Sequence, residues 1–380
     1  MIYLDNHATT PCDARVVEVI LPFFSETFGN PSSTIHAEGR KAADAIEIAR
    51  SQVAKLINAR PKEIVFTSGA TESNNIALQG LIHHSKGERK KIVTTKIEHK
   101  TIINQCKALE RLGYEIKFLP VNKFGEIIFD QAEKLIDENI LVVSVQTASN
   151  EIGTIQHIKS LAKIAHNNGA YFHTDAAQAV GKISVDVQNW DVDLLSISAH
   201  KFYGPKGVGA LYIKGGAHSI PLSPLVYGGE QEFNLRSGTL NVPGIVGIGK
   251  ACELCTRELE KDYHHLSSLR DYLEKELIDQ VEIRVNGSLN NRLPNNSSLT
   301  FPGLDTEALI VNMPDLAIST GSACSSGALE PSHVLQAIGM SREEADSTLR
   351  IGLGRFNTLS QINQSIEIII AAVQMIKGII

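Results

Sequence analysis

Two patterns of apolar residues alternate along the first two thirds of the chain. Short apolar runs are separated by longer segments in which apolar residues recur at helical spacing. The first pattern predicts buried β-strands, and the second predicts amphipathic helices. We expect strands at 63–67, 91–95, 114–119, 140–145, 170–172 and 194–197, and helices at 36–57, 100–112, 131–137 and 158–167.

This alternation also predicts the fold class. Strands that are apolar throughout and are joined by helices are typical of a mostly parallel sheet covered on both faces. After about residue 255 the pattern changes to a charged helix at 256–280, short strands at 281–285 and 297–301, and a last helix at 360–376. We therefore expect an α/β protein with a large domain at 15–255 and a smaller α+β domain made of 1–14 and 256–380.

Length, charge and composition narrow the function classes. The 380 residues exceed what a single core comfortably buries, which favours two domains. A net charge of −6 argues against non-specific nucleic-acid binding, which needs a basic face. No apolar run approaches the roughly 20 residues of a membrane span, and the first residues lack the basic and apolar parts of an export signal. We expect a cytoplasmic protein with no membrane and no direct nucleic-acid partner.

The five cysteines are scattered and odd in number, which is typical of reduced thiols in a cytoplasm. Cys252 and Cys255 form a C-x-x-C pair inside a helical pattern, and no second pair follows at zinc spacing. We interpret both as buried helix residues, in preference to metal ligands or a redox pair, and predict no metal site.

Cys324 lies in a stretch of a different kind. Nine of the twelve residues at 318–329 are Gly, Ala, Ser or Thr. Such a composition packs poorly and predicts a mobile loop. A reactive thiol must be accessible, so Cys324 is a candidate nucleophile, and an incidental surface cysteine is the alternative.

Chemically active residues follow the predicted strands. Because the carboxyl ends of parallel strands meet at one edge of a sheet, where ligands bind, we expect their side chains to share a site. These residues are His99, Asn150, Asp175, Gln178 and Lys201.

Lys201 follows the apolar strand at 194–197 and precedes a glycine-rich turn. Burial disfavours a charged amine, so its pKa should fall and leave the nucleophilic neutral form. A surface lysine at the start of a loop is the alternative. A lysine that forms a Schiff base and an aspartate, such as Asp175, that pairs with a pyridinium nitrogen together hold pyridoxal phosphate in proteins.

The segment Ser68-Gly69-Ala70-Thr71 joins a strand to a helix and is a candidate phosphate site. Free N–H groups, the positive end of the helix dipole and hydroxyl groups would point at one anion. The segment matches neither the P-loop lysine motif nor the dinucleotide glycine pattern, which argues against a nucleotide-binding module. A plain helix N-cap is the alternative.

Ten motifs in order along the chain support a family resemblance. They are Y-L-D-N-x-A-T-T-P (3–11), G-N-P-S-S (29–33), T-S-G-A-T-E-S-N-N (67–75), E-H-K (98–100), N-E-I-G (150–153), H-T-D-A-A-Q (173–178), S-x-H-K-x-x-G-P-K-G (198–207), R-S-G-T (236–239), G-S-A-C-S-S-G (321–327) and R-I-G-L-G-R-F (350–356). Together they resemble the cysteine desulfurases of the class-V aminotransferase group. The resemblance implies a fold-type I pyridoxal-phosphate enzyme, with the cofactor in the large domain, the cysteine loop in the small domain, and sites at a homodimer interface.

The resemblance also implies residue roles toward the cofactor. Lys201 would bind it covalently and later move protons on the substrate, and Asp175 would keep the ring nitrogen protonated. His99 would stack on the ring and shuttle protons, and Gln178 would hydrogen-bond the ring hydroxyl. The remaining cofactor residues, mainly around the phosphate, would be Ala70, Thr71, Ser198 and His200, with Thr239 reaching the phosphate in the other subunit.

For the substrate, the resemblance implies conversion of L-cysteine to L-alanine. Asn150 and Arg350 would bind the cysteine carboxylate, Arg350 through a bidentate fork. Cys324 would attack the sulfur as a thiolate and keep it as a persulfide. The long loop resembles the subgroup in which a mobile loop carries sulfur to an acceptor protein.

Some positions depart from the family pattern. His7 stands where a small residue is expected, residues 147–149 lack a second asparagine, and Ser-Ser-Gly follows Cys324. These departures leave the acceptor open between an iron–sulfur scaffold and a specialised pathway such as DNA phosphorothioation. A selenocysteine lyase or another class-V lyase, which would not need Cys324, and a non-catalytic sulfur-pathway scaffold are the alternative functions.

Overall fold

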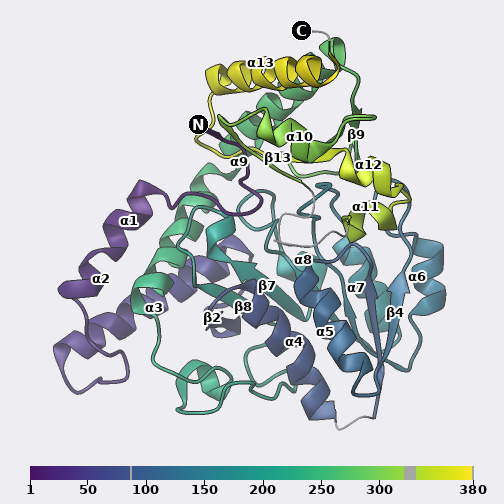
Figure 1. Cartoon of the computed structure of the whole chain (residues 1–380). Coiled ribbons are helices and arrows are strands. Elements are labelled where there is room, and N and C mark those ends of the chain that lie inside the picture. Colours follow the sequence, from purple (N-terminus) through teal and green to yellow (C-terminus); the bar gives the residue numbers. More distant parts are fainter. Residues whose placement is uncertain (86–87, 321–330, 379–380) are drawn as a thin grey trace.

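The computed structural model describes residues 1–85, 88–320 and 331–378, and in them a seven-stranded sheet forms the centre of the larger part of the chain (Figure 1). Neighbouring strands from β7 to β4 run parallel, and β8 runs antiparallel to both β7 and β2. The predicted mostly parallel sheet is therefore confirmed. In spatial order the strands are β2 (Ile64–Thr67), β8 (Gly209–Ile213), β7 (Leu194–Ser198), β6 (Tyr171–Asp175), β5 (Ile140–Ser144), β3 (Lys91–Thr95) and β4 (Glu115–Leu119).

Strand β8 was not predicted from the sequence. It directly follows the glycine-rich turn after Lys201 and itself begins with a glycine, a residue depleted in strands, so the turn pattern continues into it. β8 nevertheless matters for the site, because its first residue, Gly209, lies against Gly69. A Cβ on Gly209 would lie 2.5 Å from the Gly69 Cα, so only glycine lets the two segments approach this closely.

Helices cover both faces of this sheet, as continuous apolar strands require. One face packs mainly against α3 (Ala37–Leu56), α6 (Phe129–Leu135), α7 (Ile158–Asn167) and the first part of α9 (Val242–Gln280). The other face packs mainly against α4 (Ala70–Ser85) and α5 (Lys100–Glu110). The strand residues alternate between the two cores: Ile64 and Phe66 lie in the first, and Val65 lies in the second.

The C-terminal part builds a second sheet with its own apolar core (top of Figure 1). Within the described residues this sheet is antiparallel, in the order β12 (Ser319–Thr320), β13 (Thr348–Gly352), β10 (Asn296–Thr300) and β9 (Arg284–Val285). Its core includes the end of α9, α10 (Thr306–Val311) and α13 (Leu359–Ile376). Helix α9 crosses the expected domain boundary at 255/256 without interruption, and that boundary stays a prediction.

The remaining elements are short. At the N-terminus, β1 (Ile2–Tyr3) pairs in parallel with β11 (Leu316–Ala317), which attaches the first residues to the C-terminal part. The others are α1 (Ala14–Ile20), α2 (Pro22–Ser25), α8 (Val187–Trp190), α11 (His333–Ala337), α12 (Arg342–Asp346) and the 3-10 helices Pro61–Glu63, Ala199–Lys201 and Gln231–Asn234. None of the helices in the described stretches is long and apolar enough to cross a membrane.

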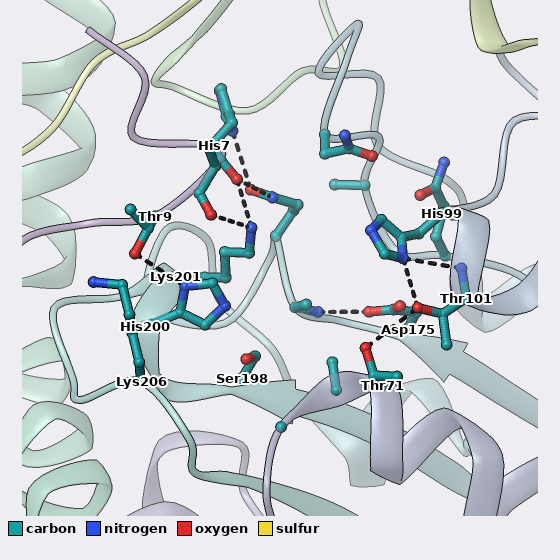
Figure 2. A pocket seen from close by; sticks show the side chains of 18 of the residues that line it. His7, Thr9, Thr71, His99, Thr101, Asp175, Ser198, His200, Lys201 and Lys206 are labelled. Atoms are coloured by element: carbon teal, nitrogen blue, oxygen red, sulfur yellow. Dashed lines mark hydrogen bonds between the residues drawn. The ribbon is translucent and has the colours of Figure 1, made fainter. Parts of the chain in front are cut away.

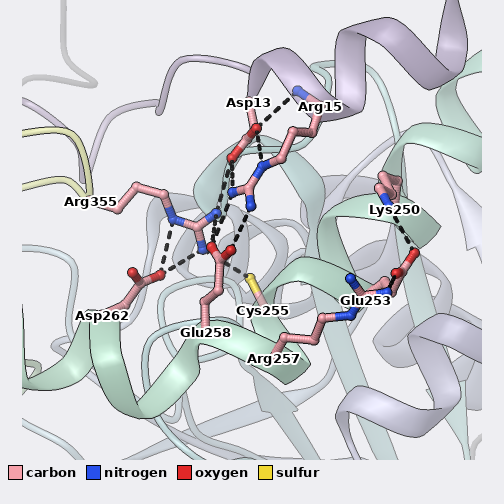
Figure 3. Close-up of polar contacts among 9 residues, drawn as sticks. All are labelled: Asp13, Arg15, Lys250, Glu253, Cys255, Arg257, Glu258, Asp262 and Arg355. Carbon is pink, nitrogen blue, oxygen red and sulfur yellow. Dashed lines mark hydrogen bonds and ion pairs between the residues drawn. The ribbon is translucent and has the colours of Figure 1, made fainter.

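An ionic network joins the N-terminal segment, α9 and the chain after β13 (Figure 3). The buried guanidinium of Arg355 contacts Asp13 at 3.2 Å and Asp262 at 2.6 Å. Arg15 bridges Asp13, at 2.7 Å, and Glu258, at 2.5 Å. Because these carboxylates come from elements far apart in the sequence, the network fixes how the chain ends meet the long helix.

Candidate active site

A cavity of about 520 Å³ opens where the carboxyl ends of the parallel strands meet the N-terminal segment and β13 (Figure 2). Most of the predicted site residues lie on its wall, although they come from distant segments. Those that line it are Ala70, Thr71, His99, Asn150, Asp175, Gln178, Ser198, His200, Lys201 and Arg350. Two do not line it in the described structure: Thr239 is exposed outside the cavity, and Cys324 lies outside the described residues.

Other residues of this wall were not among the predicted site residues. His7, Ala8 and Thr9 come from the N-terminal segment, which no strand pattern placed near the site. Thr101 and Lys206 line it as well, and each lies within a few residues of a predicted site residue, which was the signal available in the sequence.

Lys201 ends the 3-10 helix Ala199–Lys201 that follows β7, and its side chain is partly buried. Its Nζ donates to the backbone carbonyl oxygens of His7 and Ala8, at 2.7 Å each. Figure 2 shows the amine on the same side of the cavity as His7, across from His99. The N-terminal segment therefore supplies a docking place for this amine.

Asp175 is the last residue of β6 and is buried. Its Oδ2 accepts a hydrogen bond from Asn74 Nδ2 at 2.7 Å, and its Oδ1 accepts one from the Ala177 N–H at 3.0 Å. Two donors on different oxygens fix the plane of the carboxylate. Asn74 lies within the T-S-G-A-T-E-S-N-N motif, but the sequence analysis gave it no role.

His99 is the N-cap residue of α5, and its ring enters the cavity. Its Nδ1 accepts a hydrogen bond from the Thr101 N–H at 3.2 Å and lies 2.8 Å from Thr101 Oγ1. Because a backbone N–H can only donate, the proton of the neutral ring is on Nε2. Burial lowers the pKa of His99 below its ordinary value, a shift that Asp175 opposes and Lys201 reinforces. The neutral ring therefore has its one N–H at Nε2.

The candidate phosphate site lies at the start of α4. Gly69 has a φ of 151°, which favours glycine there. Ser198 Oγ lies 3.5 Å from where a Cβ on Gly69 would be, so the end of β7 lies directly beside the turn. His200 Nδ1 lies 3.1 Å from Thr9 Oγ1, and burial together with the nearby lysines lowers the pKa of His200 to about 4. Free N–H groups and hydroxyls at a helix start suit an anion.

Arg350 in β13 is almost fully buried, with 2% of its side chain exposed. Its Nη2 lies 2.8 Å from Asp5 Oδ1, and its Nη1 contacts the Asn150 carbonyl oxygen at 3.4 Å. Its Nε is buried and, within the described residues, has no hydrogen-bond partner. Arg350 lines the cavity, so its guanidinium can bind a ligand with an acceptor group.

The segments on either side of the predicted cysteine loop are held beside the cavity. On one side, Ser319 pairs with Arg350 in the small sheet. On the other side, His333 Nε2 donates to the Glu98 carbonyl oxygen at 2.9 Å, next to His99. Both ends of the segment that contains Cys324 are therefore close to residues of the cavity wall.

No group of three or more His, Cys, Asp or Glu side chains that could hold a metal ion occurs in the part of the chain that the structure describes. The cysteines described are all free: Cys106, Cys252 and Cys255 are buried, and Cys12 is partly exposed. Cys252 and Cys255 lie in α9, as predicted.

Comparison with known proteins gives the family. The model of the class-V aminotransferases matches residues 2–364. The chain is 46% identical to cysteine desulfurase IscS of Dictyoglomus turgidum, over the whole of this chain and 96% of that protein. Among solved structures it is similar to a NifS-like protein, with a TM-score of 0.92 and 37% identity over 98% of this chain and 99% of that one. It is also similar to SspA in complex with cysteine, with a TM-score of 0.84 and 38% identity over 94% of this chain and all of that one.

These matches confirm the predicted fold-type I architecture, the enzyme class and the cofactor, and they extend over the whole cavity wall described above. The chain belongs to the class-V aminotransferase family and, within it, to the pyridoxal-phosphate-dependent cysteine desulfurases.

Proposed function

We propose that the cavity binds pyridoxal phosphate and L-cysteine together, and that Cys324 takes the sulfur while L-alanine leaves. The observation that carries this proposal is the convergence of three groups on one wall: the Lys201 amine, the Asp175 carboxylate and the Arg350 guanidinium. Each group matches a different part of the two ligands.

The residues present fit the cofactor. The start of α4, with Ala70, Thr71 and the Ser198 hydroxyl, would hold the phosphate, and His200 borders the same corner. Asp175, whose carboxylate plane is fixed by two donors, would pair with the ring nitrogen. Lys201 would bind the cofactor covalently. When bound, this group supplies an electron sink for bonds broken at the substrate carbon.

The substrate carboxylate would bind Arg350 and Asn150. The guanidinium of Arg350 would form charge-assisted hydrogen bonds with a carboxylate, which favours an amino acid in this part of the cavity. A similar structure, SspA, was solved in complex with cysteine, which supports cysteine as the amino acid.

Two groups of the chain would move protons. The Lys201 amine, once released from covalent attachment, would take a proton from the substrate carbon and return to the carbonyl oxygens of residues 7 and 8. His99 would donate from Nε2, because its Nδ1 is occupied by the Thr101 N–H. The lowered pKa of His99 favours the neutral ring near pH 7, in which the N–H at Nε2 is the donor toward the bound ligands.

Cys324 would complete the reaction as a thiolate. The thiolate sulfur bonds to the sulfur of the bound cysteine, the carbon–sulfur bond breaks, and its electron pair stays with the carbon, which takes up a proton. Sulfur thus leaves as a neutral atom added to the thiolate, and no external oxidant or reductant is needed. The anchoring of Ser319 and His333 beside the cavity supports Cys324 as the attacking residue.

The test is the release of alanine and sulfide from L-cysteine with an added thiol reductant. Wild type should release the two products in equal amounts, and Cys324→Ala should release neither. Cys12→Ala is the matched control, because Cys12 is partly exposed and lies away from the cavity; it should keep wild-type rates. Activity that survives in Cys324→Ala would refute the persulfide step and favour a lyase that eliminates sulfur directly.

A homodimer and a sulfur-acceptor protein are the partners that we propose. Thr239 is exposed, as is the large apolar side chain of Tyr227, and a second copy of the chain would cover such groups. Sedimentation analysis should give twice the chain mass. The acceptor would be a protein thiol, on an iron–sulfur scaffold or in a specialised pathway, and the reduced cysteines support a cytoplasmic enzyme.

A further inference from the structure

His7 is a departure from the family pattern that lies on the cavity wall, as Ala148 also does. The N-terminal segment reaches the cavity wall because it packs on the end of β13. There the Asn6 backbone N–H donates to the Gly352 carbonyl oxygen at 3.0 Å. A Cβ on Gly352 would lie 2.7 Å from Cδ2 of His7, so the glycine leaves the room that the imidazole fills. The His7 side chain is consequently buried.

The amide of Gln178 has an orientation that can be assigned without ambiguity. Its Nε2 donates to the His7 carbonyl oxygen at 3.0 Å, and because a carbonyl can only accept, this contact identifies the nitrogen end of the amide. Its Oε1 is then the acceptor for Lys182 Nζ at 2.7 Å.

This orientation determines the tautomer of His7. Its Nδ1 lies 3.0 Å from Gln178 Oε1, which only accepts, so Nδ1 carries the proton. Its Nε2 is then bare and accepts from Asn296 Nδ2 at 3.2 Å. Each polar atom of the His7 ring has a complementary partner, and the ring is held on both sides.

Charges around the ring favour the same neutral state. Three basic residues, Lys182, Lys201 and Arg350, act on His7 from separate segments of the chain. Burial, and then the repulsion of these cations, lowers the pKa of His7 well below its ordinary value. Protonation at Nε2 would also break the bond from Asn296. His7 therefore cannot serve as a proton carrier near neutral pH.

We propose that His7 is a positioning residue that, together with Lys182, fixes the Gln178 amide so that its one remaining N–H is presented to the ring hydroxyl oxygen of the cofactor. This inference rests on the proposed function, in which Gln178 contacts that oxygen. Gln178 Nε2 has two N–H groups, and the His7 carbonyl takes one. With two donors on its Oε1, the amide cannot turn over without losing both hydrogen bonds.

The consequence is a chemical one. A hydrogen-bond donor fixed on the ring oxygen of the cofactor stabilises the negative charge of that oxygen. The oxygen then has a lower affinity for the proton that it shares with the neighbouring nitrogen. If the amide becomes free to turn, this affinity for the proton rises. The pH at which the bound cofactor changes its absorbance should then rise.

The experiment is a pH titration of the absorbance band near about 420 nm, which belongs to the cofactor, in wild type and three variants. In His7→Leu and His7→Ser the midpoint should rise by about half to one pH unit, the value of one hydrogen bond. In His7→Asn the midpoint should stay close to wild type, because the Asn Nδ2, like the imidazole Nδ1, is two bonds from Cβ and can donate in its place. An unchanged midpoint in the Leu and Ser variants, or an Asn variant that behaves like them, would overturn the proposal.

A second measurement needs neither variant nor cofactor. In cofactor-free protein labelled with ¹⁵N-histidine, the His7 signals should show a protonated Nδ1 and no titration between pH 5.5 and 8.5, a range that spans the ordinary histidine pKa of about 6.5. A proton found on Nε2 would refute the assigned network. A wild-type protein that binds no cofactor would refute the proposed function instead, and this measurement would still decide whether His7 holds Gln178.

Discussion

Arg350 Nη2 lies 2.8 Å from Asp5 Oδ1, and the same guanidinium keeps its Nε buried and, within the described residues, without a partner. The ion pair offsets the cost of burying the Arg350 charge and at the same time ties the N-terminal segment to β13. It does not use every donor of the fork. The chain is therefore built to hold this cation in place before a carboxylate arrives, which reduces the ordering that binding requires.

We expect Arg350→Lys to weaken substrate binding with little effect on folding. Lysine can keep the pair with Asp5 but has no planar fork with a spare N–H. The loss of one hydrogen bond to a charged group, about 1.5–3 kcal/mol, corresponds to a fall in kcat/KM for L-cysteine of about 10- to 150-fold. Arg284→Lys, in the exposed pair with Glu344, is the control and should change nothing measurable. Equal kcat/KM for Arg350→Lys and wild type would contradict the role in carboxylate binding.

The sequence predicts one half of this site better than the other. Asp175 and Lys201 follow apolar strands, and the topology of a parallel sheet brings strand ends together whatever the loops do. Arg350 is 345 residues from Asp5, and only the docking of the N-terminal segment on the small sheet brings them into contact. Its role came from the family resemblance, because periodicity carries no information about such a distant pair.

His7 shows the same limit in a stronger form. The sequence marks it as a departure from the family pattern, but its function depends on Gln178, Lys182 and Asn296, which come from two separate parts of the chain. No local pattern links a turn residue to a helix-spaced pair and a distant strand. The tautomer follows from the geometry of these partners, and it could not be predicted without them.

Glu98, beside His99, is a buried acid whose two hydrogen bonds do not offset its burial. It accepts from Thr95 Oγ1 at 2.7 Å and from the Gln146 N–H at 2.8 Å. Burial is the largest influence and raises the pKa of Glu98 to about 8. An unfolded glutamate has a pKa of about 4.3, so between these values the folded state keeps a proton that the unfolded chain loses. Its contribution to stability is fully present below about pH 4.3 and is lost as the pH rises through about 8.

We expect Glu98→Gln to remove this pH dependence. Between about pH 5 and 8 the free energy of unfolding of the variant should fall less steeply with pH than that of wild type. The two slopes should differ by about 1.4 kcal/mol per pH unit, the value for one proton. Urea unfolding at several pH values across this range measures the slope. Glu38→Gln is the control, since Glu38 is exposed in a helix-surface pair with Lys41. If Glu98→Gln and wild type had the same slope, Glu98 would be ionised in the folded protein.

The network around Arg355 offers a test of how the chain ends are held. The side chain is 4% exposed, lies between Asp13 and Asp262, and stacks over the Tyr203 ring at 4.2 Å. Asp262 lies on α9, and its pKa is raised by burial although Arg355 lowers it. Without the guanidinium, Asp262 would lose its nearest cation in a place that water reaches poorly.

We therefore expect Arg355→Met to destabilise the fold by about 3–5 kcal/mol, the cost of removing one partner from a buried ion pair. Methionine keeps most of the apolar stem over Tyr203, so the loss of stability would come from the missing charge more than from lost packing. Lys41→Met, which breaks the exposed pair with Glu38, should cost at most about 1 kcal/mol. Adding Asp262→Leu to Arg355→Met should recover much of the loss, because no unpaired charge then remains on α9. A double variant as unstable as Arg355→Met would mean that the stacking on Tyr203, rather than the ion pair, holds this part of the chain.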